Sequence, residues 1–499
     1  MSLLGVDIGT TNCKGGLFSP DGLCLARATR EYPILRPKPG WVEFDSNLVV
    51  AAVFDVISNL TRSGRLAADP VRAISISALG EAMTPVSRDR TVIGNAIHHT
   101  DSRGKSELDV FLEGISREDL YAINPNIASP AYSLAKLLWW RGNRPELYRK
   151  ADKFLCFGDL VFYLMGCEPV TSFSQANRTL LFDLNSESWS TELLEMAGID
   201  RDRLPRPVPS GHIAGTVRAS VAETLGLDNG VVCVVGGHDQ CCNALGVGIY
   251  RAGRAVDGIG TVECITPVFS GVPDRQLMFR AGLHIEHHVV PDHYVTFIYN
   301  QAGSLVKWFR DTFAKNECAP AGMDQYDLLV AEMPSRPSRL LVLPHFEPTG
   351  APGYIDSSSG VILGLKTATS RGEILKAIME CETFYFLDAM LALSDLGIDS
   401  SRYLASGGGA KSSAWLQIKA DIMGVPIERG ADPEAGVLGA AIIAGVAMGE
   451  YRSYEAACLN FLRPGVVFEP NLANRDIYRE QFAKYRQIYP RLRELLLIE

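Results

Sequence analysis

Three glycine-rich turns each follow a segment that the residue pattern predicts to be a strand. They lie at residues 9–11, 258–261 and 407–409. A turn without side-chain bulk leaves backbone N–H groups free to converge on phosphate oxygens. A single glycine turn is usually only a turn. Here two turns stand in similar hairpins and the third precedes a helix N-terminus, whose dipole favours anions. No GxxxxGK[ST] motif occurs, so a P-loop is not the phosphate-binding device.

Two charged residues flank the first turn. Asp7 lies at the end of the preceding strand, where a carboxylate beside a triphosphate would hold Mg²⁺ directly or through water. The alternative is an Asx-type turn residue. Lys14 lies three residues beyond Thr11 on the returning strand and could point back at the phosphates, or could simply be solvated.

Asp239 is the strongest candidate for a catalytic group. It follows a predicted buried strand at 230–235 and the pair Gly236-Gly237, so it emerges where α/β folds place ligands. A carboxylate there could accept the proton of a substrate hydroxyl as its oxygen attacks a γ-phosphorus. Gln240 could hydrogen-bond neighbouring hydroxyls. The alternative role for Asp239 is the N-cap of a helix that starts at Gln240.

Histidines and cysteines suggest two weaker possibilities. His284, His287 and His288 could bind a metal, but no cysteine or further histidine is spaced to complete a tetrahedral site, so an exposed polar strand face is favoured. Cys241 and Cys242 lack the histidine and carboxylate spacing of a thiol nucleophile, so buried apolar use is favoured.

The elements that would carry these residues form an α/β pattern that occurs twice. Strands are predicted at 3–7, 13–18, 23–29 and 71–77, with a helix over 46–61 behind a serine cap. Strands at 255–258 and 262–268 then repeat the opening hairpin, and helices are expected at 302–313, at 372–396 and after Glu434. This pattern predicts an internal duplication with domains at 1–250 and 251–499.

The composition of the chain limits the classes of molecule that it is expected to bind. The chain has 499 residues, enough for two domains, and 48 basic against 57 acidic residues give a formal net charge of −9. That balance argues against nucleic acid or anionic lipid as a partner and favours a small molecule. Eleven cysteines without a CxxC pair indicate reduced thiols, and no signal or membrane-spanning segment is predicted, so we expect a cytoplasmic protein. The oligomeric state stays open, with a homodimer as one option.

These motifs together resemble the FGGY sugar kinases, members of the actin-like ATPase superfamily, and within them the xylulokinase-like branch. The turn at 7–11 is similar to the family's first phosphate loop, Gly260-Thr261 to the second, and residues 407–412 to the adenosine loop. The most specific match is the C-terminal signature: Gly360-Val361-Ile362-Leu363-Gly364-Leu365, then Glu373-Ile374 and Ala377-Ile378-Met379-Glu380.

The resemblance implies two ribonuclease-H-like domains around a central cleft, with sugar bound mainly by the first domain and MgATP by loops of both. It makes Asp239 the catalytic base, with Gln240 beside the sugar and with Asp7 and Asp239 as the Mg²⁺ site. The residues it assigns to ATP are Thr10, Thr11, Lys14, Gly260, Thr261, Gly303, Lys307, Gly408, Gly409 and Ser413.

The acceptor is less determined than the reaction. Gly80, Glu81, Asp101 and Arg103 fall at the expected sugar site. Xylulokinases typically have Met-His-Gly around position 80, whereas glycerol kinases have Arg-Glu and an aromatic residue at what is here Ala131. Glu81 fits the second of the glycerol-kinase pair, but Gly80 and Ala131 do not.

D-xylulose is therefore the leading acceptor, with erythritol, ribulose, gluconate and glycerol as alternatives. An actin-like nucleotide-switch binding protein is the alternative from another class, and a catalytically idle homologue also stays open.

Overall fold

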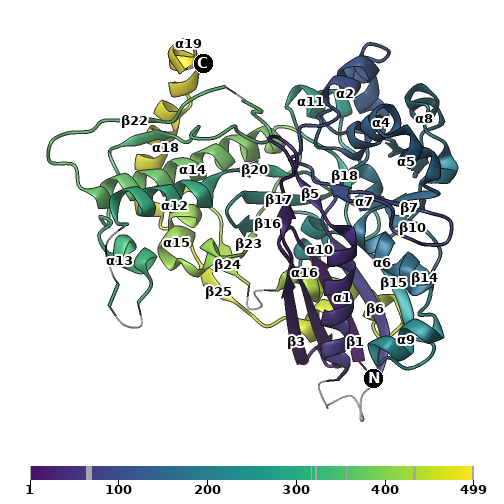
Figure 1. The fold of residues 1–499 in the computed structure, drawn as a ribbon. Coiled ribbons are helices and arrows are strands. Elements are labelled where there is room, and N and C mark those ends of the chain that lie inside the picture. Colours follow the sequence, from purple (N-terminus) through teal and green to yellow (C-terminus); the bar gives the residue numbers. More distant parts are fainter. Residues whose placement is uncertain are drawn as a thin grey trace.

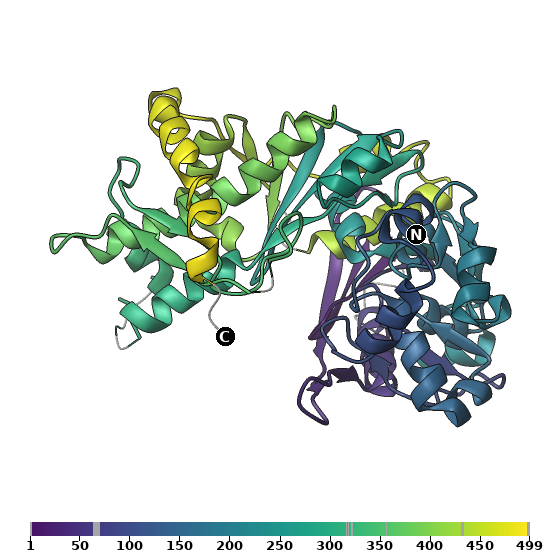
Figure 2. The same cartoon turned by 90° about the horizontal axis from the view of Figure 1, so that it is seen from above.

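The computed structural model describes residues 2–62, 70–315, 317, 319–320, 323–355, 357–430 and 434–496. The chain forms an α/β structure of two lobes, each built on one large β-sheet (Figure 1). Seen from above, the first lobe is purple to blue and the second is mostly green to yellow (Figure 2). Among the helices of the described ranges, none is long and apolar enough to cross a bilayer.

The first sheet has the strand order β14-β15-β6-β1-β2-β3. Its strands are β1 (Ser2–Ile8), β2 (Asn12–Phe18), β3 (Cys24–Glu31), β6 (Val71–Ala78), β14 (Ile213–Thr216) and β15 (Val232–His238). β1 to β3 form the predicted meander, while β6 runs parallel to β1 and β15 runs parallel to β6. β14 closes the edge antiparallel to β15.

The second sheet repeats this order. Its core strands are β16 (Arg254–Ile259), β17 (Glu263–Ser270), β23 (Tyr403–Ser406) and β24 (Ile427–Arg429), with β25 (Val466–Phe468) antiparallel at one edge. β16 pairs antiparallel with β17 and parallel with β23, and β24 runs parallel to β23. On the other side β17 pairs with β19 (His293–Val295) and β20 (Ile298–Asn300). The predicted internal duplication is confirmed.

Two helices at equivalent places in the repeats join the lobes. α10 (Asp239–Gly246) follows β15, and α16 (Ala435–Ala447) follows β24. They cross closely, because a Cβ at Gly246 would lie 1.8 Å from the carbonyl oxygen of Ala435. α16 also packs on β1 and β6 of the first sheet. The strands of the first sheet precede residue 250 and those of the second follow it, but this later helix lies against the first sheet.

Helices cover both sheets and complete their cores. In the first lobe α1 (Ser46–Thr61) and α6 (Phe157–Met165) pack apolar side chains against the strands. In the second, the core includes α12 (Ala302–Phe313), α14 (Arg371–Ser394) and α15 (Ser413–Met423). The helices predicted over 46–61 and 302–313 match α1 and α12 end to end.

The predicted serine cap of α1 is wrong. The N-cap is Asp45, whose carboxylate accepts the N–H groups of Asn47 and Leu48. The Ser46 hydroxyl instead lies 2.8 Å from that of Thr84 and accepts the N–H of Ala96.

A segment of the second half docks on the first lobe. It includes α11 (Arg275–Arg280) and β18 (Glu286–His287), and α11 lies against α3 (Arg117–Ile123), where Arg275 donates to the carbonyl of Ala122. The Tyr121 hydroxyl donates to the carbonyl of Leu283 at 2.5 Å, and the N–H of Ile285 donates to the carbonyl of Pro125 at 2.9 Å. The two halves therefore meet through main-chain contacts close to β18.

The structure corrects two further sequence predictions, one about the histidines of this segment and one about the end of β15. The histidines do not form an exposed strand face: His284, His287 and His288 are all buried, and only Glu286–His287 is a strand. Their imidazoles form hydrogen bonds within the protein; for example, His284 Nε2 lies 2.5 Å from the Tyr354 hydroxyl.

The strand predicted to end at residue 235 continues through Gly236 and Gly237 to His238. A Cβ at Gly236 would lie 2.0 Å from the carbonyl oxygen of Ile76, so close strand packing, not a turn, requires these glycines.

Cys241 and Cys242 are buried, as predicted, and burial raises the pKa of both thiols. The described cysteines are free thiols, and Cys318 lies outside the described residues.

Candidate active site

The candidate site begins at the carboxyl ends of three neighbouring parallel strands. Asp7 of β1 pairs with Ser77 of β6, and Ser77 pairs with Gly237 of β15. Asp239 follows two residues after Gly237, as the first residue of α10. Because parallel strands end at the same edge of a sheet, this register brings the two predicted carboxylates to one place.

Asp239 is a carboxylate with a raised proton affinity. Burial, followed by the negative charges of Asp7 and Glu81, raises its pKa to about 8. Its side chain is still 29% exposed and accepts the N–H of Gln240 at 2.7 Å. The N-cap of α10 is His238, so the alternative in which Asp239 itself caps the helix is wrong.

His238 Nε2 lies 3.3 Å from Asp239 Oδ1. Burial and the charge of Arg178 lower the pKa of His238 to about 3, so this neighbour is a neutral imidazole at pH 7.

Asp7 lies between a hydroxyl and a lysine. Its Oδ1 accepts a hydrogen bond from the Ser77 hydroxyl at 2.6 Å. Lys14 stands directly opposite on β2 and forms an ion pair of 2.7 Å with Glu434, at the start of α16. Burial raises the pKa of Asp7, although Ser77 and Lys14 act against that rise. The N-terminus of α16 is close, because a Cβ at Gly436 would lie 2.8 Å from the Asp7 carboxylate.

Tyr32 holds the first glycine-rich turn, at residues 9–11, in shape. Its hydroxyl donates to the carbonyl of Gly9 at 2.5 Å, and its N–H donates to the carbonyl of Thr11 at 3.1 Å. These hydrogen bonds point the carbonyls of Gly9 and Thr11 toward Tyr32. Thr10 is half-buried and Thr11 is exposed. A loop fixed in this way can present the Thr10 and Thr11 N–H groups and hydroxyls to an anion.

The second glycine-rich turn, at residues 258–261, rests on the start of α12. The N–H of Ser304 donates to the carbonyl of Thr261 at 3.0 Å, and a Cβ at Gly303 would lie 2.0 Å from the carbonyl oxygen of Gly260. Glycine at 303 is thus needed for this contact. Lys307 lies one turn further along α12, exposed and paired with Asp311 at 3.2 Å.

The third loop lies against the second. Gly407 has φ +86°, and a Cβ there would lie 2.7 Å from the carbonyl oxygen of Ile259. A Cβ at Gly409 would lie 2.3 Å from the Ile259 side chain, whereas Gly408 is in open space. The Ser413 hydroxyl accepts a hydrogen bond from Arg429 at 2.8 Å. The two glycine loops therefore meet at the end of β16.

α10 connects these loops to Asp239. One turn after Asp239, the Asn243 amide donates to the Ser406 hydroxyl at 3.4 Å, and it also lies beside Gly258. Asp7, Asp239 and the loops at 258–261 and 407–409 are thus held together by one short helix and the strand ends around it.

The loop at Gly80 and Glu81, which the resemblance places at the sugar site, contacts Arg178, a residue that the sequence analysis missed. Glu81 has φ +61°, which is uncommon for a residue other than glycine. Its carboxylate binds Arg178, with Arg178 Nε 2.6 Å from Glu81 Oε1. Arg178 also reaches Glu286 of β18, 2.7 Å from Nη1 to Oε1. A Cβ at Gly80 would lie 3.0 Å from the His238 ring, so this loop lies directly beside Asp239.

Asp101 and Arg103 form a second buried cluster. The Asp101 carboxylate accepts the N–H groups of Val42 and Arg103 and two hydrogen bonds from the Arg103 guanidinium. Arg103 also pairs with Glu43 at 2.7 Å. The Lys136 ammonium donates to the carbonyls of both Asp101 and Arg103. Asp101 is therefore held by hydrogen bonds within the protein, and direct sugar contact by Asp101 and Arg103 stays a prediction.

The donor set near Asp239 suits Mg²⁺ better than a transition metal. In the part of the chain that the structure describes, no three His, Cys, Asp or Glu side chains converge to form a metal cage. Mg²⁺ needs only one or two carboxylates, with waters and substrate phosphates completing its shell. Asp7 and Asp239 fit that requirement.

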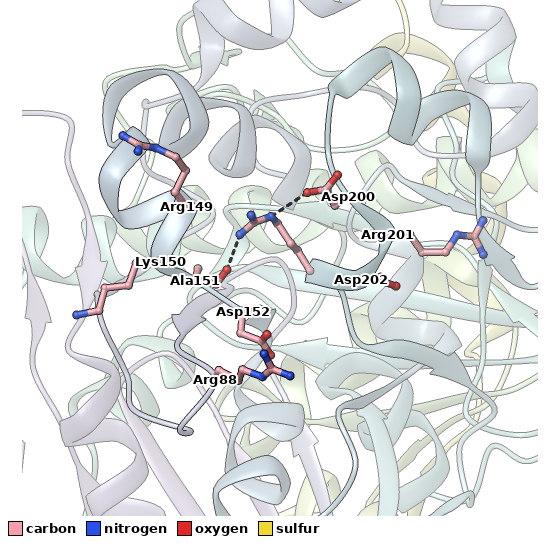
Figure 3. Close-up of a pocket in the computed structure, with 9 residues that line it drawn as sticks. Arg88, Arg149, Lys150, Ala151, Asp152, Asp200, Arg201 and Asp202 are labelled. Carbon is pink, nitrogen blue, oxygen red and sulfur yellow. Dashed lines mark hydrogen bonds and ion pairs between the residues drawn. The ribbon is translucent and has the colours of Figure 1, made fainter.

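A surface pocket lies elsewhere in the first lobe (Figure 3). It encloses about 510 Å³ and is lined by Arg88, Arg149, Lys150, Ala151, Asp152, Asp200, Arg201, Asp202 and Arg203. Arg203 already has partners within the protein, since it donates a hydrogen bond to the Ala151 carbonyl and pairs with Asp200 at 3.2 Å. The pocket shares no residue with the site around Asp239.

Comparisons with known proteins cover nearly the whole chain. Residues 2–246 match the N-terminal domain, and residues 278–448 the C-terminal domain, of the FGGY family of carbohydrate kinases. Xylulose kinase of Bacillus subtilis (strain 168) is 28% identical over 494 residues, covering 99% of this chain and 97% of that protein.

Solved structures agree in fold. The crystal structure of xylulose kinase from Rhodospirillum rubrum has a TM-score of 0.91 at 24% identity and covers 99% of both chains. That of gluconate kinase from Lactobacillus acidophilus has a TM-score of 0.88 at 23% identity and covers 98% of both chains.

Proposed function

We propose that this chain, which belongs to the FGGY family of carbohydrate kinases, transfers the γ-phosphate of MgATP to a hydroxyl of a ketose or related polyol, with Asp239 as the general base. The observation that carries the assignment is the position of Asp239. Its carboxylate has a pKa near 8, stands beside the Gly80–Glu81 loop, and is joined through α10 to the second-lobe glycine loops.

The chemistry follows from that position. The acceptor hydroxyl donates its hydrogen bond to the Asp239 carboxylate, which takes the proton as the hydroxyl oxygen attacks the γ-phosphorus. The new P–O bond forms as the bond between the γ-phosphorus and the β,γ-bridging oxygen breaks, and ADP leaves. A carboxylate whose pKa lies near the working pH suits this transfer.

Stabilisation of the phosphates is assigned to the loops. We assign the N–H groups of Thr10, Thr11, Gly260 and Thr261 to the phosphate oxygens, with Lys14 beside them. Gly303, Lys307, Gly408, Gly409 and Ser413 remain the proposed nucleotide contacts. Asp7 and Asp239 would hold Mg²⁺, which when bound neutralises charge on the phosphates.

D-xylulose is the first acceptor to test, supported by the relatives named xylulose kinase. Family membership does not favour the nucleotide-switch alternative. Free thiols throughout the described cysteines support a reducing, cytoplasmic setting, where ATP is also available.

The test is an ADP-release assay with MgATP and a panel of acceptors: ketopentoses, ketohexoses, glycerol, tetritols, pentitols and gluconate. We expect ADP release to depend on one acceptor class. ADP release without any acceptor, or none with every acceptor despite measured ATP binding, would contradict the proposed function.

A further inference from the structure

Arg178 lies between two carboxylates that come from different halves of the chain. Its Nε and Nη2 both bind Oε1 of Glu81, and its Nη1 lies 2.7 Å from Oε1 of Glu286. The side chains are 16%, 5% and 0% exposed for Arg178, Glu81 and Glu286. Since Glu286 belongs to β18, one wall of the acceptor site comes from the second half.

The guanidinium has few donors left for a ligand. Three of its N–H contacts go to the two carboxylates, and the rings of Tyr132 and Phe297 lie over it at 4.9 and 5.7 Å. Burial alone lowers the pKa of Arg178, but Glu286 and Glu81 raise it well above its ordinary value, so the side chain stays charged.

Two acceptor oxygens remain in the cluster. Both Arg178 nitrogens that reach Glu81 bind Oε1, which leaves Oε2 of Glu81 for a substrate hydroxyl. Oε2 of Glu286 is buried and has no hydrogen-bond partner among the described residues. A carboxylate oxygen accepts hydrogen bonds from hydroxyl groups but repels another carboxylate.

Among the described residues, the charges around Arg178 do not favour an anion. His99, His238 and His284 are neutral at pH 7, because burial lowers their pKa values to about 4, 3 and 3. The Lys136 ammonium is held by the carbonyls of Asp101 and Arg103. The carboxylates that face Arg178 and Asp239 are Asp7, Glu81 and Glu286.

We propose that the Glu81–Arg178–Glu286 cluster sets acceptor specificity, admitting uncharged polyhydroxy compounds and rejecting those that carry a carboxylate. This inference rests on the proposed kinase function and deepens it. Arg178 acts as a positioning residue: it holds Glu81 toward the acceptor, and because its charge is already matched by two carboxylates it does not pair with an acidic substrate. Gluconate, the substrate named for one structural neighbour, would be a poor acceptor here.

The test compares acceptors that differ by a carboxylate, namely glycerol with glycerate, xylitol with xylonate, and D-glucitol with gluconate. For wild type we expect the carboxylate compounds to have kcat/KM at least about 100-fold lower, as like-charge contact in a binding site predicts. The double variant Glu81→Gln/Glu286→Gln keeps the side-chain shapes but frees the Arg178 charge. Its ratio of carboxylate to neutral kcat/KM should rise at least about 10-fold.

Glu428→Gln is the matched control, because Glu428 also pairs with an arginine, Arg402, at 2.6 Å in the second sheet. Its acceptor ratio should equal that of wild type. Retained ADP binding shows that each variant is folded.

Calorimetry measures the dissociation constants of xylonate and xylitol in the presence of ADP, and so gives the same comparison without turnover. If the double variant leaves both the kinetic and the binding ratios within about twofold of wild type, or if wild type accepts the carboxylates equally well, the inference is wrong. If neutral compounds bind selectively but no phosphate is transferred, the inference stands and the proposed kinase function fails.

Discussion

The two copies of the glycine-turn hairpin use the same residue types in different ways. Asp7 and Asp257 occupy corresponding strands, β1 and β16, and each lies beside a lysine and a glutamate. Asp7 is accompanied by Lys14 and Glu434, whose side chains are 33% and 29% exposed. Asp257 lies 3.1 Å from Lys419, which also pairs with Glu263, and all three side chains are at most 1% exposed.

The difference shows how a duplicated carboxylate can take a structural or a chemical part. Around Lys419 the two carboxylates raise the lysine pKa although burial alone lowers it, while burial and Asp257 raise the pKa of Glu263. That arrangement leaves no room for a ligand. Around Asp7 the same set of groups borders the strand edge that holds Asp239, so it can meet phosphates and Mg²⁺.

The largest expected effect concerns the buried triad. Lys419→Met removes the cation that compensates Asp257 and Glu263, so we expect the free energy of unfolding to fall by about 3–5 kcal/mol. Urea unfolding followed by circular dichroism measures this loss. Lys14→Met, the matched change in the other repeat, should lower stability by less than about 1 kcal/mol, since its ion pair is partly exposed. Equal losses in the two variants would contradict the contrast between the repeats.

Activity should show the reverse order. Lys14→Met removes the ammonium beside Asp7 and the proposed phosphate position, so kcat/KM for ATP should fall by about 100-fold, equivalent to about 2.7 kcal/mol. Steady-state kinetics at saturating acceptor measures the effect, with Lys484→Met as a control for an exposed lysine whose partner is Glu480. A change of less than about twofold in Lys14→Met would remove Lys14 from the phosphate site.

A smaller effect is expected in the pH dependence of stability. Burial raises the pKa of Asp239 to about 8, above the ordinary value near 3.9, so the folded state keeps a proton that the unfolded state has lost. Stability from this group is therefore complete below about pH 4 and is lost as the pH rises through about 8.

Asp239→Asn has no such loss, so it should gain about 1–2 kcal/mol over wild type between pH 6.5 and pH 8. Unfolding of both proteins at the two pH values measures it. A constant difference between them would show that the pKa of Asp239 is not raised.

The sequence was sufficient for features that depend on local pattern. The repeated hairpins, the helices at 46–61 and 302–313, and the strand that leads to Asp239 could all be predicted, because alternation and helical spacing are read within one segment. One wrong prediction concerns burial: the pattern at 284–288 has the polar residues of an exposed strand, yet contacts with Tyr132, Asn177 and Tyr354 bury it.

The missed residues are those that depend on contacts between distant segments. Arg178 and Glu286 are 108 positions apart in sequence, and nothing near either one indicates their pairing. Ser77 could have been found, since a strand parallel to β1 places a hydroxyl in register with Asp7. The packing of α16 on the first sheet also depends on the whole fold, because its apolar residues would suit either lobe.

The most direct test of the central claim is acceptor-dependent ADP release by wild type and Asp239→Asn, with ADP binding measured for both. The account predicts that the variant binds ADP within about twofold of wild type and turns over the preferred acceptor about 100- to 10,000-fold more slowly, as expected for loss of a general base. A variant that keeps the turnover of wild type would show that Asp239 is not the base and would contradict the account.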